Sequence, residues 1–197
     1  MIRIQTPRLV LREHRMDDAP ALHAILSDPA ATWYIPDMHR DQPGDTEGYL
    51  RSTLRDRQAH PRLRYNLAVA DGQDVCIGEV GLRHIDGPAD SGCWTLGYYL
   101  RPDLWNHGLA TEATEAALGF IFAQGARRVS ASCLAENLSS RTVLWKCGFT
   151  REGMLLAHTW HDRQWKDCAV YLLLREEWIA REDARREGNA CRSFGET

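Results

Sequence analysis

The chain has 197 residues, of which 44% are hydrophobic and 26% charged, and its formal net charge is −3. These values fit one soluble globular domain with a substantial core. With no long basic run, nucleic acid is not an expected partner. No secretory signal and no apolar run near 18 residues is recognised, so we expect no membrane partner.

Cysteine usage points to a reducing compartment. The sequence has no C-x-x-C spacing, and most of its six cysteines lie in apolar segments, where a free cysteine behaves as a small core residue. Disulfides and metal-binding cysteine motifs are therefore not expected, and neither is a metal among the eight histidines. We expect a cytoplasmic protein without a metal cofactor.

The first half of the chain predicts alternating strands and helices. Residues 8–12 alternate as a strand does, and a helix capped by Asp17 or Asp18 follows to about residue 27. A loop is expected over 31–43, and a helix over 46–58. Turn residues then separate three predicted strands: 64–70, 75–84 and 92–100.

The second half continues this pattern. We expect helices over 110–124, 139–147 and 176–186, the first two ended by Gly125 and Gly148. Strands are expected over 129–133, 154–159 and 169–174, with a polar turn over 161–167. The fold class is therefore mixed α/β in three layers, a central sheet with helices on both faces. Residues 1–187 form one domain, and residues 188–197 are expected to fray.

The stretch from Leu96 to Ala113 carries the clearest functional signal. It predicts a strand, a turn containing Gly108, and a helix start, an order that directs several backbone N–H groups to one point. The N-terminus of the predicted helix adds partial positive charge at the same point. An anion, with a pyrophosphate as the best candidate, is expected there; the alternative is an ordinary strand-to-helix connection.

Three segments together resemble the GNAT superfamily of N-acetyltransferases, and within it the ribosomal-protein N-acetyltransferase branch of RimJ/RimL type. They are Trp105-Asn106-His107-Gly108-Leu109-Ala110, Asn137-Leu138-Ser139-Ser140 and Lys146-Cys147-Gly148-Phe149. The resemblance spans nearly the whole chain and implies the acyl-CoA N-acyltransferase fold, a mostly antiparallel sheet with a splayed strand pair. Trp105 departs from the Gln or Arg usual in the superfamily.

The resemblance implies that acetyl-CoA is the cosubstrate. Backbone amides of the loop would hold its pyrophosphate, and Gly108 would let the phosphate approach closely. The strand 92–100 would pair with the pantetheine arm, and the Leu100 amide would serve as the oxyanion donor. The residues so assigned are Tyr99, Leu100, Trp105, Asn106, His107, Gly108, Leu109, Ala110 and Thr111.

A second coenzyme A element is implied over 137–149. Asn137, Ser140 and Arg141 are its expected contacts, although Asn137 could equally be a helix cap and Ser140 a plain surface residue. Leu144 stands where many superfamily members have a tyrosine that acts as general acid. The resemblance to the ribosomal branch, which has a serine one turn earlier, implies that Ser140 is the proton donor or hydrogen-bond donor to the departing thiolate.

The general base is not evident. Branch relatives can place a glutamate near the position of Thr159, which cannot act as a base. Glu79 is our candidate, with His84, His158 and His161 behind it, and each could instead be structural. An α-amine with a pKa near 8 is about a tenth neutral at pH 7, so it could lose its proton to water.

We therefore expect an acetyl-CoA-dependent N-acetyltransferase in which a primary amine attacks directly in a ternary complex. The acceptor is a protein N-terminus or a small-molecule amine, and a homodimer is an open expectation. The alternative is a non-catalytic coenzyme A sensor or interaction module on the same fold. A nucleotide-binding protein is disfavoured, because the loop lacks the Gly-Lys-Ser/Thr of a P-loop.

Overall fold

One eight-stranded sheet runs through the computed structural model, which describes residues 1–193, with backbone only for 188–193. The strand order is β1-β2-β3-β4-β5-β6-β8-β7, and every neighbouring pair is antiparallel except β5 and β6. The strands are β1 (Arg3–Gln5), β2 (Val10–Glu13), β3 (Arg64–Ala70), β4 (Cys76–Asp86), β5 (Cys93–Leu100), β6 (Arg128–Leu134), β7 (Thr150–His161) and β8 (Gln164–Leu174).

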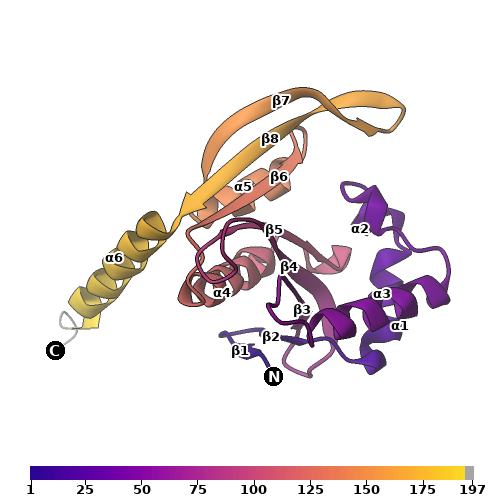
Figure 1. Cartoon of the computed structure of the whole chain (residues 1–197), viewed down its shortest axis with the longest axis horizontal. Helices are drawn as coiled ribbons and strands as arrows, with labels where there is room; N and C mark the ends of the chain where they lie inside the picture. The colour runs from indigo at the N-terminus through magenta and orange to yellow at the C-terminus, as the bar shows by residue number, and fades with distance from the viewer. Residues whose placement is uncertain (194–197) are drawn as a thin grey trace.

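Helices cover both faces of this sheet (Figure 1). The α-helices are α1 (Ala19–Leu26), α2 (Pro29–Thr32), α3 (Pro43–Asp56), α4 (Leu109–Ala123), α5 (Leu138–Lys146) and α6 (Arg175–Ser193). Short 3-10 helices are η1 (Met16–Asp18), η2 (Pro36–Met38) and η3 (Pro102–Leu104). The predicted mixed α/β class with helices on both faces is confirmed.

Two buried clusters separate the faces. The larger one joins the sheet to α4 and α5 and includes Leu96, Leu100 and Leu144. The smaller one joins the sheet to α1 and α3 through Leu22, Leu50 and Ala68. Because side chains alternate along a strand, Tyr98 packs with the first cluster and Tyr99 with the second. The register of β5 therefore decides which aromatic ring meets which helix layer.

The sheet splays open between β5 and β6. Parallel pairing joins only Cys93 to Arg128, Trp94 to Val129 and Thr95 to Ser130, although β5 continues to Leu100 and β6 to Leu134. The ends of both strands thus lie on opposite walls of a gap. This confirms the splayed pair that the family resemblance implies.

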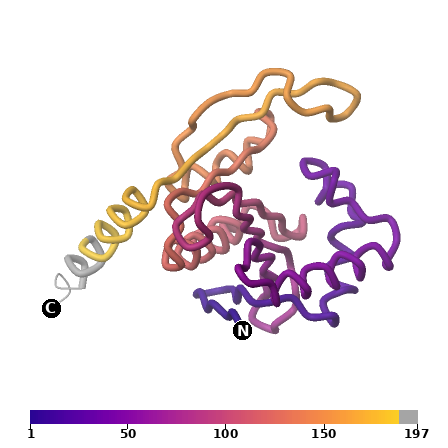
Figure 2. Tube along the Cα trace, in the orientation of Figure 1, coloured from indigo at the N-terminus to yellow at the C-terminus, as the bar shows by residue number. Residues whose placement is uncertain are grey.

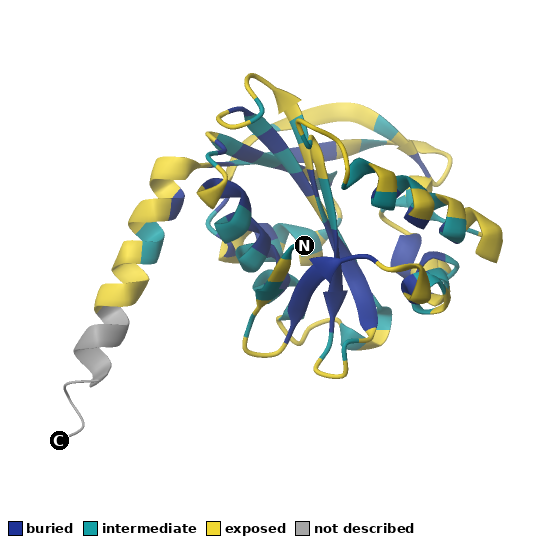
Figure 3. Ribbon diagram, turned by 60° about the horizontal axis from the view of Figure 1, so that its bottom comes forward, coloured by how far each residue is buried: buried dark blue, intermediate teal, exposed yellow. Residues whose placement is uncertain are grey.

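Several predicted boundaries were wrong. The polar segment 161–167 is mostly strand, and the turn narrows to Asp162 and Arg163 with φ of 48° and 58°. Polarity was misleading there because this hairpin is exposed on both sides (Figure 3). The predicted loop over 31–43 contains the end of α2, η2 and the start of α3.

The C-terminal helix is longer than predicted. α6 reaches Ser193, so residues 188–193 are helical where fraying was expected, and residues 194–197 lie outside the described part. Figure 2 shows α6 extending away from the sheet and the β7–β8 hairpin reaching toward α2. Near the hairpin tip, the ring of His161 meets the ring of Trp33 edge-on, with centroids 5.0 Å apart.

Candidate functional site

The gap between β5 and β6 opens into a cleft of about 470 Å³. Its walls come from β5, the loop before α4, the first turn of α4, β6 and α5, with Tyr34 and Ile35 contributed from the segment after α2. Among the described residues that line it, none is an aspartate or glutamate. The cleft therefore presents mainly backbone groups, hydroxyls and apolar side chains.

The loop at one end of the cleft has the shape of an anion site. Asn106 and Gly108 both have left-handed backbones, with φ of 63° and 76°. Gly108 caps α4, and the first intrahelical bond runs from the Glu112 amide to the Gly108 carbonyl at 3.1 Å. The amides of Leu109, Ala110 and Thr111 precede that bond, and a 15-residue helix places its positive dipole end behind them.

Contacts from elsewhere hold this loop in place. The Trp105 indole N–H donates to the Leu100 carbonyl at 2.9 Å, which ties the loop to the end of β5. Arg8 donates to the His107 carbonyl at 2.8 Å and pairs with Glu112. His107 thus contributes its carbonyl to loop closure. The loop is organised before any ligand arrives, which lowers the entropic cost of binding an anion.

The alternation of hydrogen-bonded residues along β5 shows which of its backbone groups face the gap. The Arg101 amide donates to the Ile77 carbonyl at 2.9 Å, and β4 and β5 pair in antiparallel register. Residues alternate from there, so Tyr99 directs its backbone groups to Glu79 on β4, while Tyr98 and Leu100 direct theirs into the gap. The Tyr99 amide faces β4, so of the predicted pair Tyr99 and Leu100 only Leu100 directs its amide into the gap. The Leu100 carbonyl accepts the hydrogen bond from the Trp105 indole.

β6 presents the opposite wall. The Ala135 amide donates to the Asp167 carbonyl at 2.8 Å on the β8 side, and the regular β6–β8 register continues back along the strand. Ser132 and Leu134 therefore direct their backbone groups toward the gap. An extended, amide-bearing ligand arm would find donors and acceptors on both walls, as an added strand does.

The N-terminus of α5 brings Ser140 into the cleft. The Asn137 side chain accepts from the Ser140 amide at 3.0 Å, so Asn137 caps the helix. The Ser140 hydroxyl lies 2.9 Å from the Tyr98 hydroxyl, a partner that we did not predict. Arg141 instead turns its guanidinium to the Ala135 carbonyl and the Tyr171 hydroxyl. The alternation of side chains along a strand could have indicated Tyr98 as a site residue, because Tyr98 and Leu100 point to the same face of β5.

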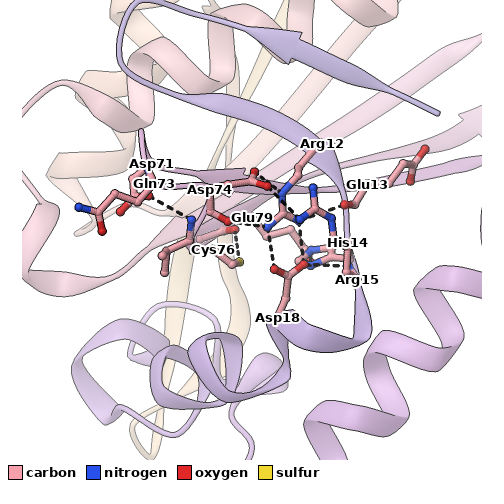
Figure 4. A network of polar contacts seen from close by, with 12 residues as sticks. Arg12, Glu13, His14, Arg15, Asp18, Asp71, Gln73, Asp74, Cys76 and Glu79 are labelled. Atoms are coloured by element: carbon pink, nitrogen blue, oxygen red, sulfur yellow. Dashed lines mark hydrogen bonds and ion pairs between the residues drawn. The ribbon is translucent and has the colours of Figure 1, made fainter.

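The candidate base Glu79 does not line the cleft. Its side chain is 5% exposed, His14 Nε2 lies 2.8 Å from one carboxylate oxygen, and Tyr49 donates to the other at 2.6 Å. Figure 4 shows Glu79 within a network that joins β2, β4 and η1. Both carboxylate oxygens are thus partnered, and Glu79 is not among the residues that line the cleft.

The network around Glu79 is strongly charged. Asp18 accepts two hydrogen bonds from Arg12, at 2.7 and 2.8 Å, and lies 3.5 Å from His14 Nδ1. Burial lowers the pKa of His14, but the nearby carboxylates of Asp18 and Glu79 outweigh it and raise that pKa to about 9. Burial opposes ionisation of Asp18, yet Arg12 and His14 hold its pKa well below the ordinary value. This arrangement indicates a structural ion network.

The histidine candidates are also placed away from the cleft lining. His84 packs edge-on against Trp94, His158 is exposed on β7, and His161 is buried against Trp33. Cys147 is buried as predicted, whereas Cys133, predicted as a core residue, lines the cleft and is partly exposed. Among the aromatic residues, Tyr34 and Trp105 line the cleft, whereas Trp94 is buried in the core.

Among the side chains of residues 1–187, no group of three from His, Cys, Asp or Glu is arranged to hold a metal ion. Across residues 1–193, none of the helices combines the length and apolarity needed to span a bilayer.

Comparisons with known proteins agree with this geometry. The profile of the acetyltransferase (GNAT) domain family matches residues 8–150. Over 176 residues the chain is 28% identical to the uncharacterized N-acetyltransferase YnaD of Bacillus subtilis (strain 168), covering 89% of this chain and 98% of that protein. A GNAT-family acetyltransferase structure from Bacillus anthracis is 25% identical, with a TM-score of 0.74 over 89% of this chain and 99% of that one.

A structure of the RimL ribosomal L7/L12 alpha-N-protein acetyltransferase in complex with coenzyme A shares the fold. Its TM-score is 0.77 at 18% identity, covering 88% of this chain and 98% of that one. The family profile spans the splayed strands, the loop before α4 and the start of α5, which are the parts that build the cleft. The chain belongs to the GNAT family and is an N-acetyltransferase.

Proposed function

We propose that this protein transfers the acetyl group of acetyl-CoA to a primary amine by direct attack in a ternary complex. One observation carries the proposal: the splayed ends of β5 and β6 and the amide-rich N-terminus of α4 line a single cleft. The amide row fits a diphosphate, and the open strand edges fit an extended amide-bearing arm. Coenzyme A combines both groups, because its diphosphate is joined to the amide-bearing pantetheine arm.

The cofactor would lie along three elements. The amides of Asn106, His107 and Gly108 and the first turn of α4 would hold the diphosphate, with Trp105 closing the loop. The outward backbone groups of Tyr98 would pair with the pantetheine arm, and the Leu100 amide would face the thioester carbonyl. The Tyr99 ring packs on the opposite face of the sheet. Asn137 would contact the cofactor while it also caps α5. The Arg141 guanidinium is hydrogen-bonded to the Ala135 carbonyl, so Arg141 would act on the cofactor through its positive charge and not through a direct hydrogen bond.

The reaction needs an oxyanion donor and a partner for sulfur. The amine nitrogen attacks the thioester carbonyl carbon, and the carbonyl π electrons move to oxygen, where the free Leu100 amide would stabilise them. Collapse breaks the C–S bond, and the electron pair leaves on sulfur. The Ser140 hydroxyl would donate a hydrogen bond to that thiolate.

The proposed basicity of the acceptor amine depends on which group takes its proton. Because the carboxylate of Glu79 is partnered and lies outside the cleft lining, water would take the amine proton. An α-amine with a pKa near 8 supplies a neutral fraction of about a tenth at pH 7, whereas a lysine amine near 10.4 supplies less than a thousandth. We propose an α-amine or another weakly basic amine as the acceptor.

Release of free thiol from acetyl-CoA tests this function. The panel would hold a peptide with a free α-amine, the same peptide with an acetylated N-terminus and one lysine, a phenylalkylamine and spermidine. We expect release with the α-amine peptide and little with the others, because their alkylamines are more basic and almost wholly protonated at pH 7. Calorimetric binding of coenzyme A with no thiol released from acetyl-CoA in the presence of the α-amine peptide would contradict the proposed acceptor.

A further inference from the structure

Two hydroxyl groups from distant parts of the chain meet inside the cleft. Tyr98 on β5 and Ser140 on α5 are 42 residues apart in sequence, and their hydroxyl oxygens lie 2.9 Å apart. The Tyr98 hydroxyl also lies 3.1 Å from the Ser140 backbone carbonyl. Both residues line the cleft, and the Tyr98 ring packs against the larger core cluster.

These distances allow two hydrogen-bond arrangements. In the first, Tyr98 donates to the Ser140 carbonyl and accepts the hydrogen of the Ser140 hydroxyl. In the second, Tyr98 donates to the Ser140 hydroxyl oxygen, which leaves the serine hydrogen free for another acceptor. Each hydroxyl has only one hydrogen, so the donor role of Tyr98 decides where Ser140 can donate.

Tyr98 keeps its hydrogen under ordinary conditions. Burial raises the pKa of Tyr98 well above its ordinary value, although the hydrogen bond to Ser140 opposes that shift. The phenol therefore remains neutral at neutral pH. A donor bond into the Ser140 oxygen also polarises the serine O–H, which strengthens the bond that Ser140 makes in turn.

We propose that Tyr98 is a positioning residue that directs the Ser140 hydrogen toward the sulfur of departing coenzyme A. This inference rests on the proposed function and deepens it. When the C–S bond breaks, sulfur takes the electron pair, Ser140 donates a hydrogen bond to it, and Tyr98 donates to Ser140. No proton leaves either hydroxyl; the amine proton goes to water, and the thiolate is protonated from water after release.

Tyr98→Phe tests the inference because it removes the hydroxyl and keeps the ring. We expect single-turnover acetyl transfer to slow about three- to tenfold, while the Kd of coenzyme A and the melting temperature change little. Ser140→Ala should slow transfer about ten- to a hundredfold. Since Tyr98 acts only through Ser140, the double variant should match Ser140→Ala within about twofold.

Tyr171→Phe is the matched control. The Tyr171 hydroxyl meets the same helix, through Arg141 at 3.3 Å, and Tyr171 is not among the residues that line the cleft. Its loss should leave transfer within about twofold of the parent chain. An unchanged rate in Tyr98→Phe, or losses that multiply in the double variant, would overturn the proposal.

A second measurement needs no acceptor amine. The pH dependence of alkylation of the bound coenzyme A thiol, followed by mass spectrometry of coenzyme A itself, reports how strongly the protein stabilises the thiolate. The thiol pKa should be lower on the protein than in solution and should rise in both Tyr98→Phe and Ser140→Ala. Equal thiol pKa values in all three proteins would refute the role of Tyr98, even if no amine is acetylated.

A non-perturbing substitution covers the case in which Tyr98→Phe fails to fold. A chain with 3-fluorotyrosine at position 98 keeps the ring and has a stronger phenol donor. Its bound thiol pKa should be equal to or lower than that of the parent chain. A higher thiol pKa would contradict the proposed direction of the hydrogen bond.

Discussion

Arg8 and Glu112 are joined by a bond of 2.7 Å between Nε and Oε2, although they are 104 residues apart in sequence. Arg8 lies just before β2, and Glu112 lies in the first turn of α4. The same guanidinium donates to the His107 carbonyl, so one side chain links the first strands to the proposed diphosphate loop. Glu112 also accepts from Thr6, which fixes its carboxylate.

This relationship predicts the effect of Arg8→Ala. The loop should become less ordered, and the Kd of coenzyme A should rise about three- to tenfold, because ordering must then accompany binding. The melting temperature should fall little, since the pair is half-exposed and such pairs contribute about 1 kcal/mol or less. Calorimetry measures the Kd. Arg51→Ala, which removes an exposed pair with Glu47 on α3, is the control and should leave the Kd unchanged.

Gly108→Arg should abolish acetyl-CoA binding in a folded chain. The residue has a φ of 76°, which costs an L-residue about 1–2 kcal/mol, and a long side chain there would cover the amides of the α4 first turn. Gly108→Ala separates the two effects: it carries the strain but not the bulk. Gly72→Arg, where an added Cβ meets no atom within 4 Å, is the control. Undiminished binding by Gly108→Arg would remove the diphosphate from this loop.

Glu79→Gln distinguishes a catalytic from a structural carboxylate. We expect the free energy of unfolding to fall by about 2–4 kcal/mol, because the buried His14 loses the nearer of its two counter-charges. The pH profile of acetyl transfer to an α-amine should keep its shape, since the proton goes to water. A loss of activity above about a hundredfold in a protein of parental stability would make Glu79 the base.

The His14 network predicts how stability depends on pH. The folded pKa of His14 is raised from 6.5 to about 9, so its stabilisation is complete below pH 6.5 and is lost as the pH rises through 9. Asp18 has the opposite shift, so its contribution is present above its ordinary pKa of 3.8 and is lost in acid. Urea unfolding should therefore show greatest stability between about pH 4 and 6.5.

Replacing His14 isolates the alkaline part of that curve. His14→Gln should remove most of the decline between pH 6.5 and 9, a change of about 2–3 kcal/mol in the parent chain. His158→Gln, at an exposed position on β7, should leave the decline in place. A parental slope in His14→Gln would show that another group titrates.

Much of the proposed cofactor site could be predicted from the sequence because its signals are local. A left-handed glycine between a strand and a helix predicts a free amide row, whatever the remainder of the chain does. Asn137 caps α5 through an amide only three residues away. The hairpin turn and the extent of α6 were predicted less well, since exposed strands and polar helices lack the apolar periodicity that marks their boundaries.

The sequence by itself determined the mixed α/β class, the Gly108 loop and the presence of Ser140 at the start of a helix, because each depends on residues within a few positions of one another. Only the tertiary structure decided that Tyr98 faces Ser140 and that Glu79 faces His14, 65 residues away in sequence. Both contacts depend on the register of β4 and β5 and of β2 and β3. A shift of one residue in that register would turn each side chain to the opposite face of the sheet.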